Sequence, residues 1–174
     1  AVAKSAPDGY TWLLAPDNVF VTNPYIAKAT TFDPLTDLQP VTEVARIQFL
    51  LVVPASLPVN SVQELIAYAK AHPGKLNYSS SGAGGAPHLA GSLLVRMAGI
   101  DITHVPYKGS GPSFQDLLAG QVQLTFDSLI QGLPHIREGK LKALAVLGET
   151  RSPLLPDVPT VAETLPGFAL TNWF

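Results

Sequence analysis

The feature that most constrains the fold is an alternation of short apolar segments with amphipathic segments that runs from residue 76 to residue 147. The apolar segments predict four strands, at 76–79, 102–106, 122–126 and 141–147. The amphipathic segments predict helices at 87–98, 112–119 and 129–138, which end at Gly99, Gly120 and Gly139. Strands that alternate with helices indicate βαβ units. We therefore predict an α/β fold with a mostly parallel sheet and flanking helices.

The chain before residue 76 predicts one more strand and helix of this kind. The continuous apolar run 49–53, ended by Pro54, predicts a central strand. Ser61 is suited to a helix N-cap, and Glu64 three residues later completes a capping box. The sequence 72–74, His-Pro-Gly, ends that helix.

Elements near the two ends are predicted from weaker patterns. The segment 9–15 follows a Pro-Asp-Gly turn and predicts a buried strand. Residues 18–28 predict a short helix that Pro24 interrupts. Residues 161–165 predict a helical turn, and 168–174 predict a strand.

The loop between the predicted strand 76–79 and the predicted helix 87–98 consists almost entirely of small residues. It contains Ser80, Ser81, Gly82, Ala83, Gly84 and Gly85, and Pro87 and His88 open the helix. Because the side chains are so small, the backbone N–H groups of the loop are open to a bound group. These N–H groups and the positive end of the helix dipole together favour an anion. We interpret the loop as a carboxylate seat with His88 beside the ligand. A tight turn whose glycines serve only the geometry is the alternative.

Two further loops follow predicted strands, where ligands of parallel sheets bind. The loop 106–111 offers Tyr107, Lys108 and Gly109, and a solvated Lys108 in a turn is the alternative. The loop 127–129 offers Asp127 and Ser128, where Asp127 either caps the next helix or accepts hydrogen bonds from a ligand or water.

Asp17 and Asn18 follow the predicted strand 9–15 and have the same two interpretations. An acid beside an anion site is unfavourable unless the ligand also carries a donor. These acids therefore hint at a ligand with an amino or hydroxyl group.

Composition excludes several classes of function. The chain has no cysteine, which excludes thiol chemistry and disulfides, and its net charge of −2 leaves no basic footprint for nucleic acid. Hydrophobic content of 47% with 14% charged residues indicates a folded chain, and no apolar run approaches the ~18 residues of a membrane span. The four histidines lack metal-ligand spacing. We therefore expect neither a metal nor a cofactor.

Known catalytic and nucleotide-binding motifs fail on particular residues. A dinucleotide fingerprint would need a glycine where Pro87 stands, and a P-loop would need Lys after Gly85. A hydrolase that uses Ser80 and His88, with Asp116 as third member, stays an alternative function, although the chain has no G-x-S-x-G motif.

Seven stretches taken in order resemble a known family. They are 6–11, 51–54, 73–78, 88–91, 104–109, 141–146 and 155–160. Together they resemble the extracytoplasmic solute-binding receptors of tripartite tricarboxylate transporters, also called the Bug family, over essentially the whole chain.

The resemblance implies a two-lobed periplasmic binding protein of type II that closes on a small organic acid and delivers it to the membrane subunits of a transporter. Segment 54–148 would be one complete lobe, and 1–53 and 149–174 would belong to the other. The implied location is the periplasm, and no bond is broken. The ligand-sensing domain of a transcription regulator shares this plan, but would need an attached DNA-binding segment.

Two departures from the family pattern affect these expectations. The family's first strand and its Pro-Gly-Gly ligand loop are expected before residue 1, and more chain is expected after Phe174, so the sequence is expected to be a piece of a longer protein. The family's anion loop usually carries hydroxyls where this chain has Gly85 and Ala86. Contacts at those two positions would therefore come from the backbone alone.

Overall fold

A computed structural model describes residues 2–26 and 31–174. The chain divides into two compact units, which are described separately. The larger unit is Ile47–Thr171, and the smaller unit consists of the residues up to Arg46 together with Asn172–Phe174. Residues 27 and 28, the end of the predicted helix 18–28, lie outside the described residues.

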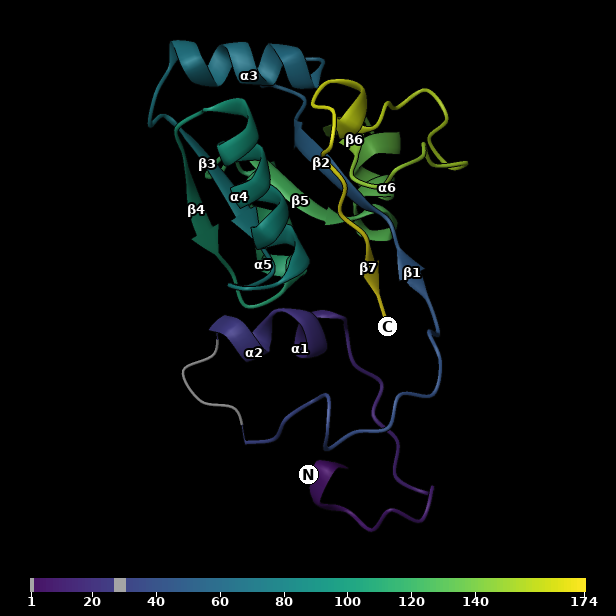
Figure 1. Cartoon of the computed structure of the whole chain (residues 1–174). Coiled ribbons are helices and arrows are strands. Elements are labelled where there is room, and N and C mark those ends of the chain that lie inside the picture. Colours follow the sequence, from purple (N-terminus) through teal and green to yellow (C-terminus); the bar gives the residue numbers. More distant parts are fainter. Residues whose placement is uncertain (1, 27–30) are drawn as a thin grey trace. The chain divides into compact units, whose positions relative to one another are not determined.

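The larger unit contains a five-stranded sheet covered by helices (Figure 1). Its strands are β2 (Phe49–Pro54), β3 (Leu76–Ser80), β4 (Ile102–Pro106), β5 (Leu124–Ser128) and β6 (Leu141–Val146). Its helices are α3 (Val62–Ala71), α4 (Ala86–Ala98), α5 (Ser110–Leu118), α6 (Leu129–Arg137) and the 3-10 helix η2 (Val161–Glu163).

The sheet is mixed but mostly parallel, with strand order β4-β3-β5-β2-β6. β3 pairs in parallel with β4 and with β5, whereas β2 pairs antiparallel with β5 and with β6. Four strands therefore share one direction and β2 alone opposes them. The carboxyl ends of β3, β4 and β5 lie at one edge of the sheet, as the alternating sequence predicts.

Each face of the sheet has its own hydrophobic core. Alternate residues of β2 point to opposite faces, so Leu51 joins the core beneath α3 and α4 and Leu50 joins the core beneath α5 and α6. All six residues of β2 are buried. This explains why the strand reads as a continuous apolar run rather than an alternating one.

The element boundaries follow the predictions closely, with one informative shift. β5 covers 124–128 rather than the predicted 122–126. Residues 121–123 form a bend before the strand, in which the Gln123 amide donates to the Asn77 carbonyl (3.0 Å). Asp127 and Ser128 consequently end the strand, and α6 begins at Leu129. The predicted loop 127–129 is therefore wrong.

The smaller unit has little regular structure. It contains η1 (Val2–Lys4), α1 (Asn18–Val21) and α2 (Asn23–Ile26). The two-residue strands β1 (Arg46–Ile47) and β7 (Asn172–Trp173) pair with each other. The predicted helix 18–28 is broken at Thr22, immediately before the Asn23-Pro24 pair. The predicted strand 168–174 shrinks to Asn172–Trp173.

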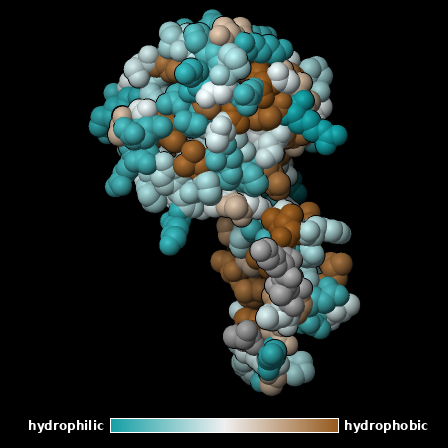
Figure 2. Space-filling view, turned by 90° about the vertical axis from the view of Figure 1, so that its left-hand side faces the viewer, coloured by the Kyte–Doolittle hydropathy of each residue, from teal (hydrophilic) through white to brown (hydrophobic). Residues whose placement is uncertain are grey.

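The predicted buried strand 9–15 is wrong. These residues have no regular structure, and Tyr10 and Trp12 are 89% and 66% exposed. A strand needs a partner for its backbone groups, and no described residue pairs with this segment. Figure 2 shows apolar residues at the surface of this unit.

The two compact units divide at 46/47 and at 171/172, outside the lobe boundaries implied by the family resemblance. The lobes at 54–148, 1–53 and 149–174 concern the complete receptor and stay a prediction. Among the helices of the described residues, none is both long and apolar enough to cross a membrane.

Candidate functional site

Three helices begin at the carboxyl edge of the sheet, and none of them is capped by a side chain. The N-cap residues of α4, α5 and α6 are Gly85, Gly109 and Ser128, and none of them makes a side-chain capping bond. By contrast, the Ser61 hydroxyl at the start of α3 accepts from the Glu64 amide (3.1 Å). The positive ends of three helix dipoles therefore lie together with few internal acceptors.

Hydrogen bonds join the three predicted loops to one another. The amides of Tyr107 and Gly109 donate to the carbonyls of Ser80 (2.9 Å) and Ser81 (3.0 Å). The Ser110 hydroxyl donates to Asp127 Oδ1 (3.0 Å). The structure thus brings together the predicted residues that follow β3 and β4 with those that end β5.

The small-residue loop 81–85 divides its backbone donors between itself and the outside. The Gly82 amide donates to Ser80 Oγ (3.3 Å), and the Gly84 amide donates to His88 Nδ1 (3.0 Å). The amides of Ala83, Gly85 and Ala86 have no acceptor among the described residues. Gly84 has φ +81°, which residues other than glycine rarely adopt. The backbone conformation of the loop therefore favours glycine at this position.

A histidine pair lies against this loop. The rings of His88 and His104 stack with centroids 4.1 Å apart, and Tyr78 stacks on His104 at 4.8 Å. His104 Nε2 lies 2.7 Å from the hydroxyl of the buried Ser80. Burial, and to a lesser extent His88, lowers the pKa of His104 to about 4.

Sequence reasoning missed the role of His104, which it treated as a structural residue of a strand. The pattern did contain a signal. His104 is a polar ring in a strand expected beside 76–80. The register places it opposite Tyr78, two residues from Ser80 on the same face of β3.

Asp127, the second-last residue of β5, is 3% exposed. Its Oδ1 accepts from the Ser110 hydroxyl and from the Ser128 amide (2.7 Å), whereas its Oδ2 is buried with no partner among the described residues. Burial raises the pKa of the Asp127 carboxyl. The acid thus accepts from one side chain of α5 and from the N-cap amide of α6, and within the described part of the chain it makes no hydrogen bond to the start of α4.

The β4–α5 segment is held by its aromatic residue. The Tyr107 hydroxyl donates to Asp116 Oδ2 (2.6 Å), and burial, with the acceptor Asp116, raises the pKa of Tyr107 to about 12. Lys108 is exposed and forms no ion pair with any residue the structure describes. Its ammonium group is therefore available to a ligand.

Asp17 and Asn18 belong to the smaller unit. Asp17 is the N-cap of α1 and accepts from the Asn18 amide (2.9 Å) and from the side chain of Asn172. Burial raises the pKa of the Asp17 carboxyl. The capping interpretation of Asp17 is confirmed, and a ligand contact by Asp17 or Asn18 stays a prediction.

The arrangement expected for a hydrolase is not formed. His88 faces the Gly84 amide, Asp116 faces Tyr107, and the Ser80 hydroxyl is buried and donates to the Gly82 carbonyl (3.0 Å). Within the described ranges, no group of three His, Cys, Asp or Glu side chains is placed to hold a metal ion.

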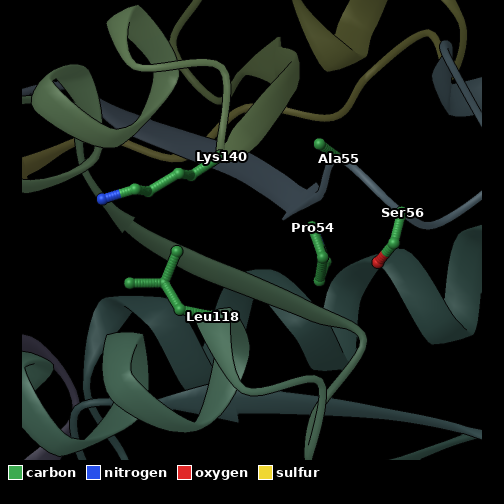
Figure 3. A pocket seen from close by; sticks show the side chains of 5 residues that line it. All are labelled: Pro54, Ala55, Ser56, Leu118 and Lys140. Carbon is green, nitrogen blue, oxygen red and sulfur yellow. The ribbon is translucent and has the colours of Figure 1, made fainter.

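A shallow hollow of about 460 Å³ lies at the opposite edge of the sheet (Figure 3). It is lined by Pro54, Ala55, Ser56, Leu118 and Lys140. Lys140 pairs with Glu138 (2.8 Å), and the remaining lining is mostly apolar. The hollow lacks the convergent polar groups that a ligand site requires.

Comparison with known proteins decides the family. The model of the tripartite tricarboxylate transporter family receptor, TctC, matches residues 1–174. The chain belongs to this family. Curated TctC-family relatives include a UPF0065 protein of Cupriavidus necator, 41% identical over 171 residues, and protein BugT of Bordetella pertussis, 39% identical over 176 residues.

Those matches cover 98% and 100% of this chain but 51% and 54% of the relatives, so the chain spans about half their length. Two solved TctC-like structures share its fold. The R. palustris protein Rpa4515 with adipate has a TM-score of 0.92 and 42% identity, and covers 99% of this chain and 58% of its own. MatC from Rhodopseudomonas palustris with bound malate has a TM-score of 0.86 and 33% identity. The match covers 99% of this chain and 59% of the MatC chain.

Proposed function

We propose that this TctC-family chain is the ligand-capturing part of a periplasmic receptor that binds a small organic carboxylate and delivers it to the membrane subunits of a tripartite tricarboxylate transporter. The observation that carries the proposal is the edge at which α4, α5 and α6 begin without side-chain caps. Adipate and malate, found with two relatives, are the first ligands to test.

The carboxylate would sit against loop 81–85. The free amides of Ala83, Gly85 and Ala86 would donate to it, and the N-terminus of the 13-residue helix α4 would favour its charge. Ser81, Gly82, Gly84 and His88 would line this seat. Because Gly85 and Ala86 have no hydroxyl, recognition there would depend on main-chain donors alone.

The other two segments would complete the grip. Tyr107, Lys108 and Gly109 supply a cation and a fixed turn, and Asp127 and Ser128 supply an acceptor for a hydroxyl or amino group of the ligand. Asp17 and Asn18 are proposed as further ligand contacts. The segment 54–148 is proposed to lie within one lobe of the complete receptor, with 1–53 and 149–174 in the other.

The magnitudes are sufficient for a receptor. Hydrogen bonds to a charged group contribute about 1.5–3 kcal/mol each. Three or four of them approach the ~8 kcal/mol of a micromolar complex. Receptor function needs no covalent step, in keeping with the buried and internally bonded Ser80 hydroxyl.

The test is a thermal-shift and calorimetry screen with adipate, malate, amino acids and aromatic acids. It is run on this chain and on a version extended to the length of the relatives. We expect an acid to stabilise the extended protein, and the uncharged dimethyl ester of the same acid to have no effect. If no acid stabilises the extended protein, the proposal is wrong.

A further inference from the structure

The histidine pair contacts loop 81–85 at two separate points. His88 reaches the loop directly, because the Gly84 amide donates to His88 Nδ1 (3.0 Å). This bond requires a lone pair on Nδ1, so the neutral ring carries its proton on Nε2. His88 therefore fixes the second half of the loop only while Nδ1 is unprotonated.

His104 reaches the first half of the loop through Ser80. The Ser80 hydroxyl lies 2.7 Å from His104 Nε2 and 3.0 Å from the Gly82 carbonyl, and it accepts from the Gly82 amide. A hydroxyl has one hydrogen to donate. All three contacts are satisfied when His104 Nε2–H donates to Ser80 and Ser80 donates to the Gly82 carbonyl.

We propose that His88 and His104 are positioning residues that hold the two halves of loop 81–85, and thereby keep the amides of Ala83 and Gly85 free for the ligand carboxylate. The ligand part of this inference rests on the proposed function. The part that concerns the loop rests on the contacts of the ligand-free chain.

Protonation of the pair should loosen the loop. A proton on His88 Nδ1 would replace the acceptor of the Gly84 amide with a second donor. Two charged rings with centroids 4.1 Å apart would also repel each other. Tyr78 is the titratable group that packs on His104 from β3, and its hydroxyl lies 3.3 Å from Ser92 Oγ. Among the described residues, no acid forms an ion pair with either ring that would offset the charge.

Four variants separate the hydrogen-bonding role from bulk. His88→Ala and His104→Ala remove the contacts. His88→Asn places an oxygen near Nδ1, and His104→Gln places an amide nitrogen near Nε2, so both keep the bond with a side chain that carries no ionisable group. His72→Asn is the control, because His72 stacks on Tyr68 of α3 and its Nδ1–H donates to the Tyr68 carbonyl (2.9 Å), away from the loop.

The first readout needs no ligand. Amide hydrogen exchange of Gly82 and Gly84 is followed by NMR in the ¹⁵N-labelled chain. We expect His88→Ala to speed Gly84 exchange by about tenfold or more, and His104→Ala to do the same for Gly82. His88→Asn, His104→Gln and His72→Asn should stay within about twofold of the parent. Parent rates at both glycines in both Ala variants would overturn the proposal.

If an Ala variant fails to fold, the pH profile decides instead. We expect the protection of the Gly84 amide, corrected for intrinsic exchange, to decrease as the pH is lowered in the parent but not in His88→Asn. Equal profiles would overturn the proposal.

The second readout is calorimetry with adipate and malate. Each Ala variant should bind about tenfold more weakly, and His88→Asn should bind within about twofold of the parent. Absence of binding by the parent counts against the proposed function alone, because the exchange rates still test the loop.

Discussion

At the scale of single residues, the most unusual feature of the candidate site is the buried carboxyl group of Asp127. Asp127 is 3% exposed and keeps one carboxylate oxygen without a partner among the described residues, although Lys108 lies exposed in a neighbouring segment. A buried acid is retained at a cost, because burial disfavours the charged form. The two donors that reach Oδ1, Ser110 and Ser128, offset part of that cost.

The raised pKa of Asp127 predicts a pH effect with a definite sign. The folded protein holds this proton to higher pH than the unfolded chain, whose carboxyl titrates near 3.8. The stability that the protonated form contributes is therefore lost as pH rises through 3.8 and the folded pKa. Relative to the parent, Asp127→Asn should gain unfolding free energy as the pH rises from below 3.8 towards neutrality.

Urea denaturation of both proteins across this range measures the difference. Asp101→Asn, a change at an exposed acid, is the control and should show no such trend. A constant difference between Asp127→Asn and the parent at all pH values would contradict the prediction.

At the scale of elements, close packing between α4 and β3 positions the loop that joins them. A Cβ on Gly91 of α4 would overlap the buried ring of Tyr78. That ring also packs edge-on against Phe126 and stacks on His104, so it has little room to move. The absence of a side chain at residue 91 therefore lets α4 approach the sheet at the level of the site.

Gly91→Ala should destabilise the chain by about 1–3 kcal/mol, because the added methyl group must displace the ring or the helix. Gly132→Ala in α6 is the matched control, since a Cβ on this buried helical glycine would meet only ordinary contacts, the nearest with Leu50 Cδ1 at 3.5 Å. That change should be neutral or slightly stabilising. Equal unfolding free energies of the two variants in urea would argue against the packing explanation.

The cap of α3 makes a separate prediction. Ser61→Ala removes the acceptor of the Glu64 amide and should cost about 1 kcal/mol, whereas Ser61→Asp should restore most of that loss. The thermal midpoints of the three proteins provide the measurement. A midpoint for Ser61→Ala that matches the parent would show that water replaces the cap.

The elements of the larger unit were largely predictable because their signals are local. Glu64 lies within one turn of Ser61, and Gly99 stands next to the last residue of α4. The reciprocal bond of the capping box differs, since the Glu64 carboxylate accepts from the Asn60 amide (2.7 Å) rather than from Ser61. Partner choice is not local. The segment 9–15 has strand propensity but no strand to pair with among the described residues, and the contact of His104 with Ser80 depends on strand register.

At the scale of the whole molecule, burial is distributed unequally between the two units. Nearly all buried apolar side chains belong to Ile47–Thr171, whereas the smaller unit exposes Tyr10, Trp12, Tyr25 and Leu35. Local opening costs little where few apolar contacts are lost. The smaller unit should therefore open more readily than the sheet.

Hydrogen exchange followed by mass spectrometry tests this directly. We expect peptides from β2, β3 and β5 to exchange slowest, and peptides from 5–15 and 36–45 to exchange within the first time point. A carboxylic acid that binds the protein should slow amide hydrogen exchange most at residues 81–86. Protection of 5–15 equal to that of β2 would contradict the unequal distribution of burial.

The antiparallel placement of β2 has a consequence for synthesis on the ribosome. Leu51 is paired on its two sides with Phe126 and with Ala145. The nascent chain can form α3, β3, α4 and β4 early, but it must carry the most apolar strand of the protein without either neighbour until those distant segments have been translated. A chaperone that holds extended apolar peptides would have its longest opportunity to bind at 49–54.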